Sequence, residues 1–197
     1  MTKYITIILA SIITNILAYS SRSGLCFSDV SGMTSGMGVS TLSSNGSQWS
    51  IAVSRSGSVY SVTVSGGSSF KGLLLYGRMA GNSTSNIQEF PSVGSWSKLD
   101  DKYQTLGTQC AKYGSENSVL SHNSDVVKQA PTTFIWNPPM INSAIEFRGM
   151  VVVNGKTEWV SLPPVTVTVS KSSKNSITFP IFLVTLIAFI MNMHSDF

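Results

Sequence analysis

The feature that most constrains the fold is an Asn-Gly pair, Asn154 and Gly155, which stands between two apolar segments. The segment before it, residues 143–153, reads "SAIEFRGMVVV", and "TEWVSL" follows at residues 157–162. Asn-Gly between such segments is the strongest short-range signal for a β-hairpin, because both residues tolerate the positive φ that its tight turn needs. The sequence therefore predicts a pair of antiparallel strands in this part of the chain.

Other segments repeat the strand pattern. Apolar and polar positions alternate in residues 58–66, which end at a Gly-Gly pair. The apolar run of residues 132–137 ends at Pro138 and Pro139, which cannot donate a hydrogen bond to a neighbouring strand. Residues 28–50 are rich in Ser, Gly and Thr and are expected to be extended and loop-like. No segment of residues 21–170 sustains a helical apolar period over three turns. Short strands separated by turns predict an all-β sandwich, with its other strands expected at residues 70–81, 132–137 and 165–170.

The amino-terminal 20 residues have the pattern of a signal peptide. Lys3 precedes an apolar core of 13 residues, 5–17, and small residues at Ala18 and Ser20 predict cleavage after Ser20. The alternative is a transmembrane anchor, which needs about 20 apolar residues. The shorter run favours the signal peptide and hence a secreted chain.

The carboxyl-terminal end, residues 177–197, begins with an apolar run of 15 residues. A polar spacer, residues 171–176, comes before it, and small residues make Ser170 and Ser173 candidate attachment points for a glycosylphosphatidylinositol (GPI) anchor. The alternative is a single-pass helix, which would leave no Lys or Arg on the cytoplasmic side. We expect the lipid anchor, and both alternatives place residues 21–170 on the outer face of the plasma membrane.

The charge of residues 21–170 excludes one class of partner. Ten Lys and Arg against eight Asp and Glu give a net charge of +2, with no run of like charges, so we expect no nucleic-acid partner. Two sequons, at Asn45 and Asn82, lie in polar Gly/Ser-rich sequence and are expected to carry glycans in a secreted chain.

The two cysteines, Cys26 and Cys110, both lie in the expected mature domain. An even number in an oxidising compartment favours a disulfide over metal or redox chemistry. Such a bond would join the start of the domain to its middle, across 84 residues. Neither a CxxC motif nor a zinc-ligand spacing is present.

Six blocks of this sequence, in order, resemble the Reeler (reelin N-terminal) domain. The resemblance covers residues 26–169, and departs where the family has Pro and His after its first cysteine, because this chain reads "CFSDVSGM". The six blocks are "YSVTVSGGSSFKGLLLYGRMAG", Cys110, "LSHNS", "FIWNPP", "IEFRGMVV" and "EWV".

The resemblance implies an immunoglobulin-like antiparallel β-sandwich in which Cys26 and Cys110 form the family's long-range disulfide. Reeler domains occur in matrix proteins, secreted insect defence proteins and relatives of ferric-chelate reductases. In the last group other domains carry the haem, and this chain has no counterpart of them. The resemblance therefore implies neither a cofactor nor an enzymatic activity.

His122 is the only histidine outside the last residues of the chain, and Asp125 and several serines stand near it. Nucleophilic catalysis would need an oriented base aimed at a nucleophile. No GxSxG motif is present, and serine is too common here to be informative. We therefore expect His122 to hold a loop rather than to act in catalysis. A metal site is not expected either, because the acidic residues are scattered and Asp100 and Asp101 suit a solvated turn.

The aromatic residues divide into two groups. Trp136 and Trp159 lie in strand patterns and are expected in the core, whereas Trp49, Trp96 and Tyr103 lie in loop-like sequence. An exposed aromatic platform would stack on a sugar or anchor a protein, and a small core beneath long loops is the alternative. Trp96, Tyr103 and His122 are the possible ligand contacts that follow from the first interpretation.

Three functions remain open at this stage. The first is a non-enzymatic recognition or adhesion module on the cell surface, which binds an extracellular glycan, a microbial surface or a matrix protein, with innate immunity as its most specific form. The second is a structural component of a surface coat or matrix. The third, an accessory part of a ferric-chelate reductase system, rests on family association alone.

Overall fold

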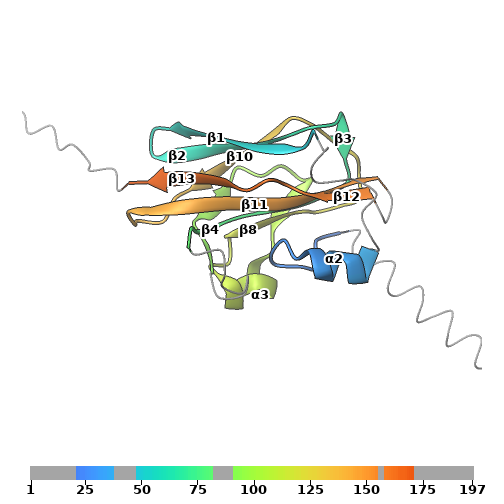
Figure 1. Ribbon diagram of the computed structural model, residues 1–197, viewed down its shortest axis with the longest axis horizontal. Helices are drawn as coiled ribbons and strands as arrows, with labels where there is room; N and C mark the ends of the chain where they lie inside the picture. Colours follow the sequence, from blue (N-terminus) through green and yellow to red (C-terminus); the bar gives the residue numbers. More distant parts are fainter. Residues whose placement is uncertain (1–20, 38–47, 82–90, 155–157, 171–197) are drawn as a thin grey trace, which may run out of the picture.

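The computed structural model describes residues 21–37, 48–81, 91–154 and 158–170. Its elements form two antiparallel sheets that pack face to face, with two short helices on the outer side of one sheet (Figure 1). This arrangement confirms the expected all-β, immunoglobulin-like sandwich. Among the described residues, no helix is long and apolar enough to cross a membrane.

The smaller sheet has the strand order β1-β2-β10-β6. Its first two strands form a hairpin, in which Ser56 pairs with Val59 across a two-residue turn. Inward-facing residues alternate with outward Ser and Thr, which explains the alternation in the sequence. The strands are β1 (Ser50–Ser56), β2 (Val59–Ser65), β10 (Thr132–Asn137) and β6 (Ser95–Ser97).

The larger sheet has the order β12-β11-β4-β8-β7, with β13 on β11 and β5 on β4. The 12-residue strand β11 pairs with β4 along one side and with β13 and then β12 along the other. A separate two-stranded ribbon joins β3 to β9. These elements are β3 (Ser69–Phe70), β4 (Gly72–Met79), β5 (Ser92–Val93), β7 (Tyr103–Thr105), β8 (Val119–His122), β9 (Lys128–Gln129), β11 (Ser143–Asn154), β12 (Glu158–Ser161) and β13 (Val165–Val169).

The hairpin predicted around Asn154 is confirmed by the pairing of β11 with β12, in which Asn154 stands opposite Glu158. The strands expected at residues 58–66, 132–137 and 165–170 are present as β2, β10 and β13. The strand expected over residues 70–81 is divided at Lys71 into β3 and β4.

The core lies between the two sheets and is rich in aromatic rings. Trp136 is fully buried at its centre, and its ring meets those of Phe147 and Tyr60 edge to face, with centroids 4.9 and 5.8 Å apart. Edge-to-face contacts of this kind stabilise the core beyond their buried area, by about 0.5–1.5 kcal/mol each. Trp136 and Trp159 are both buried, as expected, but Trp136 lies between the sheets whereas Trp159 packs with Met33 and Met150 outside the larger sheet.

A second layer covers the outer face of the larger sheet, and the disulfide between Cys26 and Cys110 holds it there. Strand β4 is buried on both faces, because Leu73 and Leu75 pack into the core while Leu74 and Tyr76 pack under this second layer. The disulfide joins residues 21–37 to the helix α3 (Gly107–Cys110), which a 3-10 turn, η2 (Ala111–Tyr113), follows.

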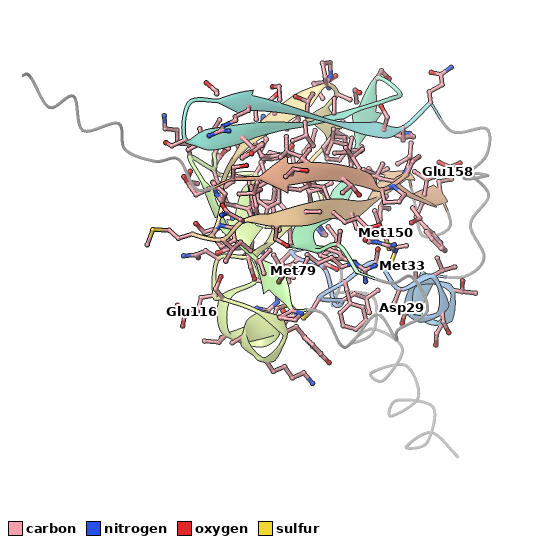
Figure 2. The ribbon with its side chains drawn as sticks, turned by 60° about the vertical axis from the view of Figure 1, so that its left-hand side comes forward. Asp29, Met33, Met79, Glu116, Met150 and Glu158 are labelled. Atoms are coloured by element: carbon pink, nitrogen blue, oxygen red, sulfur yellow. A yellow bond between two sulfur atoms is a disulfide. The ribbon has the colours of Figure 1, made fainter. Side chains whose placement is uncertain are left out.

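Part of the segment expected to be loop-like is a helix, α2 (Val30–Met37). The Asp29 carboxylate accepts the Ser31 N–H at 2.9 Å, which is how a residue caps a helix start. Met33 packs with Met150 and Trp159, and Figure 2 shows Met33 and Met150 close together beneath β11. A helix of two turns needs only one such apolar contact, so it leaves no helical period in the sequence.

Candidate recognition surface

The three possible ligand contacts from the sequence lie inside the protein. Trp96 is 4% exposed, Tyr103 7% and His122 6%, so they form no exposed aromatic platform. Trp96 lies on β6 and donates its Nε1–H to the Ser118 carbonyl oxygen at 2.9 Å. Tyr103 packs edge to face on Phe134, and burial raises the pKa of its hydroxyl above the ordinary 10.0. This corrects the expectation of exposed contacts in favour of core residues.

His122 ends strand β8, beside Tyr103 of β7. Its Nδ1 lies 3.2 Å from both the main-chain N and O of Leu73, and 3.4 Å from the hydroxyl of Ser121. That hydroxyl is itself fully buried and accepts the Ser23 N–H at 2.8 Å. A substrate cannot reach a buried hydroxyl, so the neighbouring Ser121 and His122 hold strands together rather than form a nucleophile and its base.

Two loops next to this core are exposed and are joined to each other. Loop 98–102 connects β6 to β7, and loop 123–127 connects β8 to β9. Asn123 links them, because its main-chain N–H donates to the Lys102 carbonyl oxygen at 2.8 Å and its Nδ2 to that of Asp101 at 3.2 Å. We call these two segments the loop pair.

The first loop is a tight turn built on Asp100. The Asp100 carboxylate accepts the Lys102 N–H at 2.9 Å, and its carbonyl oxygen accepts the Tyr103 N–H at 3.2 Å. This is the Asx-type turn that an aspartate favours. Asp100 and Asp101 are exposed, as expected for a solvated turn. No group of three or more His, Cys, Asp or Glu that suits a metal ion occurs among the residues described.

The second loop is held from beneath by Lys128, whose side chain is 1% exposed. Its ammonium group donates to the carbonyl oxygens of Lys71, Ser124 and Val126 at 2.8, 2.7 and 2.8 Å. Burial lowers the pKa of this group below the ordinary 10.5. Three short bonds satisfy the buried ammonium group and tie loop 123–127 to the main chain of Lys71.

The tip of this loop presents two apolar side chains to solvent. Val126 is 57% exposed and Val127 is 47% exposed, and both stand between Asp125 and the buried Lys128. Exposed apolar side chains on a rigid loop, with charges around them, are the usual composition of a protein contact site. Sequence reasoning missed this site, because two valines beside a lysine in the sequence do not reveal that the lysine is buried.

A second polar group lies on the outer face of the larger sheet. Glu146 accepts hydrogen bonds from the Nε of Arg78 at 2.8 Å and the Nε of Arg148 at 2.9 Å. Burial alone would raise the pKa of Glu146, but the bonds from Arg148 and Arg78 outweigh it, and the pKa lies below the ordinary 4.5. Because the carboxylate is shared between two guanidinium groups, this cluster joins β4 to β11.

Several residues expected to carry function lie outside the described residues. They are the sequons at Asn45 and Asn82, the candidate attachment residue Ser173, the signal peptide and the carboxyl-terminal tail. Ser170 is described, and it is exposed immediately after β13. The glycan, cleavage and anchor assignments stay predictions.

The two packed sheets, and the outer layer that the Cys26–Cys110 disulfide holds on the larger one, define the class of protein as a disulfide-bonded β-sandwich module. A family model described as the Reeler domain matches residues 33–175, more than half of the chain. The chain therefore belongs to the Reeler domain family, whose members are typically extracellular, non-catalytic modules. A comparison with curated proteins gives no match.

Solved structures similar to this chain include the human F-spondin reeler domain. Its first fragment is 14% identical, with a TM-score of 0.45 over 61% of this chain and 87% of that one. The second fragment is 16% identical, with a TM-score of 0.45 over 61% and 91% of the two chains. The Reelin-N domain of F-spondin is 14% identical, with a TM-score of 0.43 over 64% and 87%.

Proposed function

We propose that this chain is a non-enzymatic recognition or adhesion module that the cell displays on its outer surface. The observation that carries the proposal is the loop pair, in which Lys128 fixes a loop whose Val126 and Val127 are exposed. A loop that is already ordered loses little conformational entropy when a partner binds. The site is therefore suited to binding.

A protein surface is the partner class that this site fits best. Recognition of a sugar ring commonly uses an exposed aromatic side chain, and all four tryptophans of the chain are buried. Two exposed valines flanked by Asp125 and the turn at Asp100 instead suit an apolar patch with a polar margin. A protein of a microbial surface, recognised in defence, is the most specific form of this proposal, and a matrix protein is the general form.

The test is to display the full chain on cells that lack it and to measure their adhesion to immobilised matrix proteins, to heat-killed microbes and to purified microbial glycans. Adhesion to either protein-bearing surface, lost when Val126 and Val127 are both changed to Ser, supports the proposal. Adhesion to the glycans alone would replace the protein partner by a sugar. Adhesion to none of the three would contradict the recognition function.

The position on the membrane is tested separately with phosphatidylinositol-specific phospholipase C. Release of the displayed chain into the medium supports a lipid anchor, for which Ser170 and Ser173 are the candidate attachment residues. Retention, while a control lipid-anchored protein is released from the same cells, supports a single-pass helix in residues 177–197.

A further inference from the structure

We propose that the end of the sandwich where β13 finishes rests on the outer leaflet of the cell's own membrane, with the Met140 side chain inserted between the lipid headgroups. This inference rests on the proposed function, because it requires the residues after Ser170 to hold the chain at the cell surface. It adds a second contact surface to that function, with lipid as the partner.

Met140 lies in the loop that joins β10 to β11, residues 138–142. It is 88% exposed, the most exposed of the large apolar side chains among the described residues. Its neighbours are held in place, because Pro139 is half-buried and Ile141 packs against the core between the sheets. The Ile141 N–H donates to the Pro139 carbonyl oxygen at 2.8 Å, which closes a three-residue turn around Met140. Met140 therefore stands at the tip of an ordered turn, and little main-chain entropy is lost when it meets a partner.

The same end of the sandwich is where the chain leaves β13. Ser143, the first residue of β11, pairs with Val169, the last residue of β13, and the exposed Ser170 follows. Figure 1 shows the start of β11 and the end of β13 on the left of the molecule, together with the turn between β1 and β2. The loop of Met140 runs directly into Ser143, so it lies beside the point where the chain leaves the fold.

The sequence after Ser170 keeps this end close to the membrane. Six residues, 171–176, precede the apolar run of residues 177–191. Six extended residues span at most about 20 Å, which limits the distance from the bilayer if the apolar run crosses it. A lipid anchor on Ser170 or Ser173 attaches the chain at most four residues after Val169. Under both modes of attachment, the end that carries Met140 is the part of the sandwich held nearest to lipid.

A lipid surface is the occupant that this end fits. Removal of an apolar side chain from water is favourable, and the tether raises the effective concentration of lipid around Met140, so that even one weak contact is populated. A second exposed methionine, Met79, is 39% exposed and lies at the same end, because it pairs with Ile145 near the start of β11.

The loop pair lies away from this end. β6 runs antiparallel to β10, and its first residue, Ser95, pairs with Asn137 just before the loop of Met140. Loop 98–102 follows the last residue of β6, so it lies further from Met140. With Met140 on the membrane, the loop pair is presented outward, where an extracellular partner can reach it. The residues after Ser170, and not Met140, keep the chain on the cell, so a change at Met140 leaves adhesion through the loop pair intact.

The test uses the displayed protein, isolated in mild detergent from the cells that carry it and inserted into phosphatidylcholine vesicles. An environment-sensitive fluorophore, NBD, is attached to one new cysteine, Met140→Cys at the proposed contact or Val126→Cys in the loop pair. Cys26 and Cys110 are bonded to each other and take no label. Lipids with a nitroxide on the upper acyl chain quench a fluorophore that enters the bilayer. We expect about twofold quenching at residue 140 and none at residue 126.

A second reporter excludes a contact that the fluorophore itself creates. NBD is attached through Ser58→Cys, in the exposed turn between β1 and β2 at the same end, while Met140 is kept or replaced by Ser or Leu. Quenching at residue 58 should fall about twofold with Met140→Ser and persist with Met140→Leu, because the apolar side chain holds this end on the lipid. Thermal unfolding of each variant checks that the sandwich is intact.

The possible failures have different meanings. Protein that stays in the vesicles without quenching at residue 140, or equal quenching with Met140→Ser and Met140→Leu, would overturn the lipid contact and leave display on the cell surface standing. Quenching at residue 126 instead would place the loop pair on the membrane and overturn it as well. A residue-140 label that is shielded from iodide on cells but unquenched in vesicles would replace lipid by a protein partner. Protein that does not float with the vesicles would contradict the membrane attachment in the proposed function, and the lipid contact with it.

Discussion

The ammonium group of Lys128 lies 2.7 Å from the main-chain carbonyl oxygen of Ser124, beneath the exposed loop 123–127. The same group also reaches the carbonyl oxygens of Val126 and Lys71, so one buried cation joins the loop to the start of β4. A charge is expensive to bury unless it is fully hydrogen-bonded. The arrangement therefore keeps the loop in one conformation and connects its shape to the stability of the sandwich.

The first prediction concerns this contact. Lys128→Met removes the three hydrogen bonds from the buried ammonium group to the carbonyl oxygens of Lys71, Ser124 and Val126, and it is expected to lower the free energy of unfolding by about 2 kcal/mol. The exposed Lys102 on the neighbouring loop provides the control, and Lys102→Met should change the free energy of unfolding by less than about 0.5 kcal/mol. Chemical denaturation measures both, and hydrogen exchange should become faster in loop 123–127 for the Lys128 variant alone. Equal effects of the two substitutions would show that Lys128 does not hold the loop.

The second prediction concerns Gly94, which lies between β5 and β6. Its φ is 73°, and a Cβ there would overlap the indole ring of Trp136. Gly57 has a similar φ of 63° but open space around it. Gly57→Ala should lower the free energy of unfolding by about 1 kcal/mol, from backbone strain alone. Gly94→Ala should lower it by about 1–3 kcal/mol more, because the new Cβ overpacks the core. The two variants are compared by denaturant unfolding, and equal losses would contradict the packing around Trp136.

The third prediction is a pH dependence. Because the pKa of folded Glu146 lies below its ordinary 4.5, the carboxylate stabilises the fold above pH 4.5, and this contribution is lost as the pH falls through the folded pKa. Glu146→Gln cannot titrate, and at neutral pH it should be less stable by about 1–3 kcal/mol. Unfolding measured from neutral to acid pH should show this difference becoming smaller. A difference that stays constant would mean that Arg78 and Arg148 do not favour the ionised form.

The fourth prediction concerns the disulfide. Replacing both Cys26 and Cys110 by Ser removes a cross-link over 84 residues and should lower the free energy of unfolding by about 2–4 kcal/mol. It should also loosen residues 21–37 on the outer face of the larger sheet, so that hydrogen exchange becomes faster in this segment. Thermal unfolding and the rate of hydrogen exchange provide the two readouts. Unchanged exchange in a destabilised variant would show that other contacts hold the segment.

Much of the fold could be predicted because its signals are local. The Asn154–Gly155 pair and the alternation in residues 58–66 depend on neighbours in the sequence, and each becomes a strand or hairpin as expected. Trp136 follows the same rule, since its position in an alternating strand already placed it on the inner face.

The remaining features depend on contacts between distant residues. The Ser/Gly-rich sequence around Trp96 predicts a loop, but Trp96 lies on a strand of three residues, too short to show alternation, and pairs with Trp136, forty positions further on. A lysine is normally expected at the surface, and only the folded structure shows that the Lys128 ammonium group donates to the Lys71 carbonyl oxygen, 57 positions earlier in the chain. Helix α2 is held by Met33 against Met150 and Trp159, which no local pattern reveals.

The measurement that tests the recognition function most directly compares two apolar substitutions in the adhesion assay with cells that display the full chain. Val126→Ser with Val127→Ser changes the loop pair. Met140→Ser removes the side chain that is the most exposed of the large apolar ones among the described residues, at 88%, and that lies beyond the opposite end of β10. We predict that the valine variant loses most adhesion while the Met140 variant keeps it, with equal amounts of both chains on the cells. Equal adhesion by the two variants would contradict the assignment of the loop pair as the recognition surface.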